Sequence, residues 1–78
     1  SIMTFDFEDR YYTTTEIKRK FCIKDKTWRI WMYGDKKRRR NKQDILSMGL
    51  VKVPGTNYYV VDPVKFQDWF KELCGVEE

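Results

Sequence analysis

The sequence predicts a small α+β domain: two short helices joined by a tight turn, a basic insertion, a β-hairpin and a C-terminal helix. Three observations predict this order. Apolar residues recur at helical spacing through residues 14–33, two runs of β-forming residues flank a Pro-Gly turn, and an amphipathic stretch opened by a proline follows them. The chain is expected to form one domain over residues 1–78, with residues 1–10 as an N-terminal arm or short strand and residues 75–78 as a tail.

The first helix is expected to run from about Thr14 to Phe21. Thr13 and Glu16 have the spacing of a capping box, in which the side chain of each residue binds the free backbone N–H of the other. Ile17 and Phe21 are four residues apart and share one face of this helix, so they are expected to point into the core.

A connection of about three residues leads to the second helix, which begins at Lys24 or Asp25 and ends at Gly34. Asp25 is the better N-cap by its chemistry. The buried stripe of this helix is expected to be Trp28, Trp31 and Met32, which are spaced i, i+3, i+4. The opposite side carries Lys26, Thr27, Arg29, Ile30 and Tyr33.

The insertion that follows is strongly basic. Residues 35–42, DKKRRRNK, contain no apolar side chain and cannot be core. They form an exposed loop or the first turns of a third helix that continues through Ile45 and Met48 to Gly49.

A hairpin and a last helix complete the chain. Leu50–Val53 and Tyr58–Val61 are rich in β-formers and flank Pro54–Asn57, which has the composition of a turn. Asp62 or Pro63 starts the last helix, since proline is favoured at the first helical position. That helix is expected to end at Gly75, to bury Phe66, Trp69, Phe70 and Leu73, and to set Trp69 against Trp28 and Trp31.

The composition argues against an enzyme. There is no histidine, and Cys22 and Cys74 alone cannot make an ordinary zinc site, which needs four ligands. A cysteine nucleophile would lack the imidazole that usually activates it, and no Asp or Glu spacing suggests a catalytic carboxylate pair. We therefore expect no catalysis, no metal and no cofactor, and we expect both thiols to be packing residues.

The sequence contains no signal for a membrane or for export. No apolar run approaches the roughly 18 residues that suggest a membrane span. Residues 1–10 lack a basic region followed by an apolar region, so no signal peptide is predicted and a cytoplasmic protein is expected.

Positive charge is concentrated in one segment. Residues 18–42 carry twelve Lys or Arg and two Asp, a net charge of +10, whereas the rest of the chain carries four basic and ten acidic residues, a net charge of −6. This dipolar layout is typical of a domain that presents one face to phosphates. The alternative is a run of charge that is only solvated.

The order of the predicted elements is that of a winged-helix domain, and two stretches narrow the family. Tyr12–Ile17 (YTTTEI) with Ile23–Met32 (IKDKTWRIWM) resembles the opening of excisionase-like and MerR-like winged helices. There a Leu-Thr-x-x-Glu start leads to a Gly-Val-Ser-x-x-Thr turn and second helix. Tyr58–Phe70 (YYVVDPVKFQDWF) is similar to the family's wing strand and final helix. Two features depart from the family: Cys22 stands where a Gly is usual, and about fifteen residues from Gly34 to Met48 replace a short connection.

This resemblance implies a non-catalytic DNA-binding protein of a phage or other mobile element, either an excisionase that steers an integrase or a transcription regulator. It implies that the outer face of the second helix enters the major groove and that the wing reaches a phosphate or the minor groove. A helix fits the major groove, and Arg can bind guanine O6 and N7 together. The basic insertion can hold phosphates by charge alone. The predicted DNA-binding residues are Lys24, Lys26, Thr27, Arg29, Ile30, Tyr33, Lys36, Lys37, Arg38, Arg39, Arg40, Lys42, Lys52, Thr56, Asn57 and Tyr58.

Two other functions remain open at this point. The basic insertion and an outward wing Tyr, which can stack on a base, also suit a single-stranded nucleic-acid-binding accessory protein of replication. A small phage protein could instead use the same frame to dock an acidic protein partner. For the leading prediction the partners are duplex DNA, an integrase or recombinase, and further copies of the chain bound cooperatively on DNA.

Overall fold

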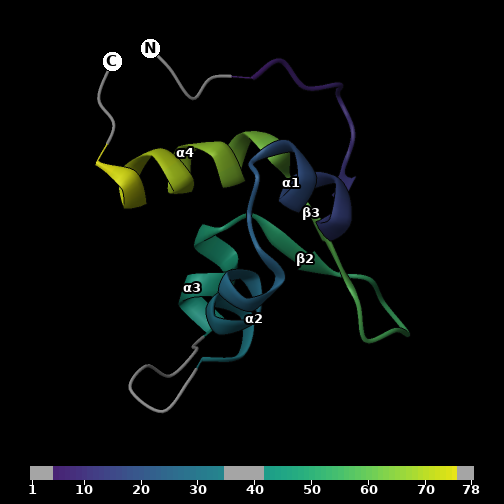
Figure 1. Cartoon of the computed structure of the whole chain (residues 1–78). Helices are drawn as coiled ribbons and strands as arrows, with labels where there is room; N and C mark the ends of the chain where they lie inside the picture. The colour runs from purple at the N-terminus through teal and green to yellow at the C-terminus, as the bar shows by residue number, and fades with distance from the viewer. Residues whose placement is uncertain (1–4, 35–41, 76–78) are drawn as a thin grey trace.

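The computed structural model describes residues 5–34 and 42–75 and shows a small α+β arrangement of helices around a short sheet (Figure 1). In chain order its elements are β1 (Tyr12–Thr13), α1 (Thr14–Lys20), α2 (Asp25–Tyr33), α3 (Lys42–Ser47), β2 (Leu50–Lys52), β3 (Tyr59–Val61) and α4 (Pro63–Cys74). The α+β class and the order of helices and hairpin are confirmed within these ranges. None of these helices combines the length and the apolar composition that a membrane span requires.

The three strands form an antiparallel sheet in the order β1-β3-β2, so the last strand of the sequence lies in the middle. Val61 pairs with Tyr12 on one side and with Leu50 on the other, and all three side chains are buried. Because side chains alternate along a strand, the next row faces away from the core, and Val51 in that row is exposed. The sequence did not predict β1, whose two residues are too few to show a period.

The core is dominated by aromatic rings from α1, α2 and α4. Phe66 of α4 is fully buried, with its ring centroid 5.0 Å from that of Phe21 and 5.8 Å from that of Trp28. Ile17 and Met32 are buried beside them, as their helical spacing predicted. Ring pairs at such separations contribute about 0.5–1.5 kcal/mol beyond the area they bury, which matters in a domain of this size.

Helix α4 has the ends that its sequence predicted. The Asp62 side chain accepts from the backbone N–H of Val64 at 3.1 Å and of Lys65 at 3.3 Å, so it is the N-cap, and Pro63 occupies the first helical position. Gly75 closes the helix in the left-handed region at φ 73°.

The buried face of α4 is shorter than predicted. Phe66 and Phe70 are buried, and the half-buried Trp69 sets its ring centroid 5.1 Å from that of Trp31. The prediction that Leu73 is core is wrong, because its side chain is 46% exposed. Leu73 lies in the last turn, so the apolar stripe of α4 continues past the part of the helix that the core covers.

Gly49 is required where α3 meets β2. Its φ is +82°, and a Cβ there would lie 2.8 Å from Lys65 Cβ and 2.9 Å from the Asp62 carbonyl oxygen. Its carbonyl also accepts from the Asp62 N–H at 2.8 Å. The absence of a side chain therefore lets the start of α4 approach the hairpin closely.

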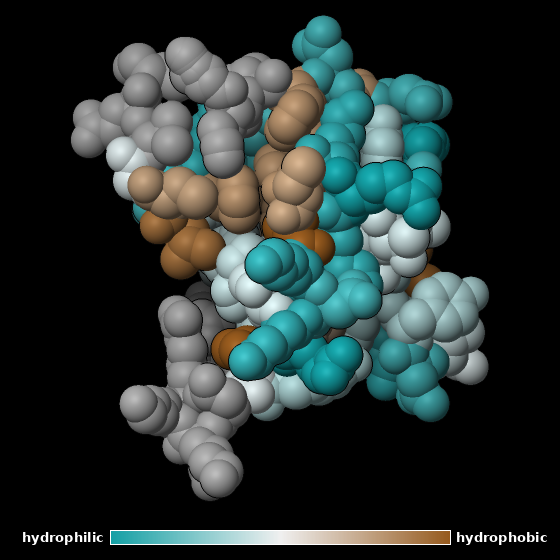
Figure 2. All heavy atoms as spheres, viewed as in Figure 1, coloured by the Kyte–Doolittle hydropathy of each residue, from teal (hydrophilic) through white to brown (hydrophobic). Residues whose placement is uncertain are grey.

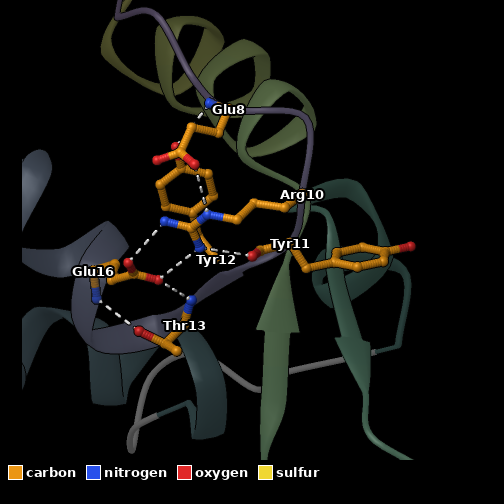
Figure 3. Close-up of polar contacts among 6 residues, drawn as sticks. All are labelled: Glu8, Arg10, Tyr11, Tyr12, Thr13 and Glu16. Atoms are coloured by element: carbon orange, nitrogen blue, oxygen red, sulfur yellow. Dashed lines mark hydrogen bonds and ion pairs between the residues drawn. The ribbon is translucent and has the colours of Figure 1, made fainter.

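Helix α1 begins with the predicted capping box, and Arg10 reinforces it (Figure 3). The Thr13 N–H donates to Glu16 Oε1 at 2.9 Å, and the Glu16 N–H donates to Thr13 Oγ1 at 3.1 Å. Arg10 binds both oxygens of Glu16 while its guanidinium lies 3.9 Å from the centre of the Tyr12 ring. The Arg10 guanidinium, and next the Thr13 N–H, lower the pKa of Glu16 to about 2.

The N-terminal residues in the described range form an arm that packs against the helices, with no strand at the two phenylalanines. The rings of Phe5 and Phe7 lie 5.0 and 6.2 Å from that of Phe21. The Phe5 N–H donates to Oε1 of the buried Gln67 at 2.7 Å, which ties the arm to α4.

The prediction that both thiols are packing residues is wrong. Cys22 and Cys74 are free and exposed. Cys22 lies in the turn between α1 and α2, and Cys74 is the last residue of α4, so one thiol stands at a chain reversal and the other at a helix end.

Candidate nucleic-acid interface

Helix α2 has one apolar face and one polar face. Trp28 and Met32 are buried, whereas Lys26, Arg29 and Tyr33 are exposed, Tyr33 to 67%. The helical spacing places these three exposed side chains on one side of the helix. Thr27 is exposed toward the edge of that side, and Lys24 is exposed just ahead of the helix.

Three predictions about α2 need adjustment. Trp31, which was expected in the buried stripe with Trp28 and Met32, is only half-buried. Ile30, which was expected on the open side, is half-buried. The N-cap is Lys24 and not Asp25, and no side-chain bond caps the helix. Asp25 is the first helical residue, and its carboxylate contacts Lys18 of α1 at 3.0 Å.

The turn that joins α1 to α2 is tight because Cys22 takes the left-handed conformation. Its φ is 57°, and the Ile23 N–H beyond it donates to the Lys18 carbonyl at 2.8 Å. Only glycine adopts that conformation without strain, so a Gly would suit this place, as the family resemblance implied. The turn fixes the direction in which α2 leaves α1.

The buried side of α2 is held from behind by aromatic contacts with α4. The ring centroid of Trp31 lies 6.2 Å from that of Trp28 and 5.1 Å from that of Trp69. Trp28 also packs on Phe66, so both tryptophans of α2 contact aromatic rings of α4. These contacts set which side of α2 faces outward.

The hairpin ends in a well-defined turn. The Thr56 N–H donates to the Val53 carbonyl at 3.1 Å across Pro54 and Gly55, and Gly55 has the positive φ of 78° that such a turn requires. The Thr56 hydroxyl donates to the same carbonyl at 2.7 Å and accepts from the Tyr58 N–H at 3.4 Å.

That turn decides which wing side chains remain open to a ligand. The hydroxyl of Thr56 is engaged inside the turn, so its role is to shape the hairpin. Asn57 and Lys52 are exposed, and Tyr58 is 62% exposed while its neighbour Tyr59 is half-buried. One tyrosine of the adjacent pair points outward, as predicted, and it is Tyr58.

Helix α2 and the hairpin turn lie in the lower half of the molecule in Figure 1, away from α4 and the N-terminal arm. The space-filling view shows hydrophilic side chains gathered in the lower centre, where Figure 1 places α2 (Figure 2). The structure thus brings the predicted residues of α2 and of the hairpin to one end of the molecule.

Part of the predicted interface lies outside the described residues. That part is Lys36, Lys37, Arg38, Arg39 and Arg40. Lys42 opens α3 at the end of the same run.

Acidic side chains gather at the other end of the protein. Those exposed on the N-terminal arm and on α4 are Asp6, Glu8, Asp9, Asp68 and Glu72. In Figure 1 the arm and α4 lie above α2, so these acids stand away from the exposed cations of α2, although Lys20 of α1 lies over the rings of Phe5 and Phe7 in the arm.

The described residues contain no group of three or more His, Cys, Asp or Glu side chains that could hold a metal ion. An open groove of about 570 Å³ lies between the N-terminal arm and the start of α4, with Phe7, Arg10, Tyr11 and Val64 among its lining residues. It is distant in the fold from the polar face of α2 and does not include any predicted DNA-binding residue.

Comparison of the chain with protein-family models, with curated proteins and with solved structures finds no match in any of the three.

Two ion pairs that shape this region were not predicted from the sequence. Lys18 and Asp25 are seven residues apart, and Arg10 and Glu16 are six apart. Neither spacing is that of side chains paired on one helix. Each pair forms because a turn or a strand end reverses the direction of the chain. The identities of the residues gave no signal for these contacts.

Proposed function

We propose that this chain is a winged helix-turn-helix protein that binds duplex DNA and performs no catalysis. The order α1, turn, α2, hairpin and α4 supports the winged-helix assignment, as does the pairing of β1 with the hairpin in the order β1-β3-β2. The resemblance of residues 12–32 and 58–70 to excisionase-like proteins supports the particular branch.

The observation that carries the proposal is the exposed face of α2. Lys26, Arg29 and Tyr33 stand together on a helix whose other face is fixed by Trp28 and Trp31. A rigid helix with exposed cationic and hydrogen-bonding side chains suits the major groove, where Arg reads guanine bidentately. In this proposal α2 supplies base contacts, and the lysines near its start supply phosphate contacts.

The hairpin acts as the wing. Its Pro-Gly turn is internally bonded, so Lys52, Asn57 and Tyr58 reach a phosphate or the minor groove from a fixed position. The basic run Lys36–Lys42 adds charge-based affinity that does not depend on sequence. The protein then works as an excisionase beside an integrase, or as a transcription regulator, and can assemble cooperatively on neighbouring sites.

Fluorescence anisotropy with labelled duplex and single-stranded oligonucleotides of the same sequence tests this proposal. We expect the duplex to bind more tightly, and excess unlabelled random duplex to compete less well than a selected site. Arg29→Gln should weaken binding of the selected site, whereas Lys65→Gln on α4 should not. Equal loss in both variants would mean that α2 is not the contact element.

One observation favours a second candidate, binding of single-stranded nucleic acid. Tyr58 projects from the hairpin with 62% of its surface exposed, and an exposed ring can stack on an unpaired base. In that case the single strand would bind more tightly than the duplex, and Tyr58→Ala would weaken single-strand binding by about 1–3 kcal/mol.

A further inference from the structure

Asp25 is an acid on the helix face that is proposed to meet DNA. It is the first residue of α2 and stands four residues before Arg29 and eight before Tyr33, so the three side chains form one stripe. The Asp25 side chain is 78% exposed. An exposed carboxylate at such a place repels phosphates and so weakens binding that depends on charge alone.

The position of this carboxylate is set by α1. Lys18 Nζ lies 3.0 Å from Asp25 Oδ1, and the Lys18 side chain is itself only 24% exposed. The pair bridges the two helices across the turn at residues 21–24. Asp25 is not needed as a cap, because Lys24 occupies the N-cap position. Its carboxylate is therefore oriented by Lys18 and still open to solvent.

We propose that Asp25 is a specificity-determining residue that accepts a hydrogen bond from the exocyclic amino group of cytosine or adenine in the major groove. Lys18 is its positioning residue. This inference rests on the proposed function, in which the N-terminal residues of α2 contact base edges. Cytosine N4 and adenine N6 are donors, whereas guanine O6 and thymine O4 are acceptors that a carboxylate repels.

The stripe also predicts the spacing of the preferred bases. Arg29 has the opposite preference to Asp25, since it donates to guanine O6 and N7. Four helical residues span about 6 Å, close to two base steps of about 3.4 Å each. The preferred site should therefore carry a cytosine or adenine about two base steps from a guanine.

Selection of binding sites from a random duplex library tests the inference. The wild-type protein should favour cytosine or adenine about tenfold over guanine or thymine at one position. Asp25→Ala should erase that preference, keep the guanine preference and raise affinity for random DNA. Asp68→Ala removes an exposed acid from α4 and should leave the selected motif unchanged. Circular dichroism of each variant is the control for folding.

Two further variants distinguish base recognition by Asp25 from a purely structural role of this residue. Asp25→Asn keeps the size of the side chain and adds a donor, so selection should shift toward adenine, whose N6 and N7 an amide binds together. Lys18→Met should weaken the preference at the same position only, whereas Arg19→Met, one residue along α1, should not.

The possible failures are distinguishable. If Asp25→Ala and Asp25→Asn select the wild-type motif, the inference is wrong while the proposed function stands. If the wild-type protein binds duplex DNA without selecting a base at this position, the inference is also wrong. If the wild-type protein binds no duplex DNA at all, the proposed function itself has failed.

Discussion

Trp28→Ala should destabilise the protein more than any change at the other two tryptophans. Trp28 is 7% exposed and contacts Phe66, the fully buried ring at the centre of the core, as well as Trp31. Truncating a buried Trp to Ala typically costs about 3–5 kcal/mol. A chain of this length has a free energy of unfolding of about 4–12 kcal/mol, so the loss would be at least about a quarter of the stability.

Thermal and urea unfolding followed by circular dichroism measure this loss. For a domain of this size a loss of 1 kcal/mol lowers Tm by about 4–8 °C, so Trp28→Ala should lower it by at least about 12 °C. Trp69→Ala, at a half-buried position, should cost roughly 2 kcal/mol. Val64→Ala, at an exposed position of α4, should cost less than about 0.5 kcal/mol. If Trp28→Ala and Val64→Ala unfold alike, the core described above is wrong.

Three further predictions concern the close approach at Gly49, the capping cluster and the proposed DNA contacts. Gly49→Ala should cost at least about 2 kcal/mol because it adds a clash with Asp62 and Lys65 to a strained backbone. Gly55→Ala, which meets only the strain, should cost about 1 kcal/mol, and equal urea midpoints would refute the clash. The folded pKa of Glu16, about 2, lies below its ordinary value of 4.5, so its stabilisation is present above pH 4.5 and is lost as pH falls toward 2. As the pH falls through that window, the Tm of the wild type should therefore fall further than the Tm of Glu16→Gln, and parallel curves would show that Arg10 and the Thr13 N–H do not bind the Glu16 carboxylate. Arg29→Ala should cost about 1–3 kcal/mol of affinity for the selected site only, whereas Arg39→Ala should weaken selected and random DNA alike, as competition titrations would show.

The parts of the fold that the sequence predicted are those with a clear period or a strong end signal. The spacing of Ile17 with Phe21 and of Trp28 with Met32 identified the inner faces of α1 and α2. Strand β1 was missed because its pairing with Val61 depends on where the hairpin lies in space. The same apolar period led to the wrong prediction that Leu73 is core. A period shows which side of a helix is apolar, but it does not show how far the core extends along that helix.

The sequence predicted which residues of α2 are exposed, but it did not predict the contacts that position the side chains of the candidate site. Lys26 and Arg29 were identified from helical spacing alone, and the structure leaves both exposed. The engagement of Thr56 inside its turn follows from the path of the backbone, which residue types do not determine. The Lys18–Asp25 pair depends on the left-handed turn between two helices, and residue types do not determine that conformation.

The dependence of duplex-DNA affinity on salt tests the central claim most directly, because each neutralised phosphate adds about −0.9 to the slope of log K against log salt concentration. We expect a steep slope for the wild type. The double variant Lys26→Gln/Arg29→Gln should lower its magnitude by up to about 1.8 if both residues meet phosphates, and by less if Arg29 binds a base. Lys65→Gln, on α4, should leave the slope unchanged. A flat wild-type response, or a slope that Lys65→Gln changes as much as the double variant does, would contradict the assignment of α2 as the DNA-binding helix.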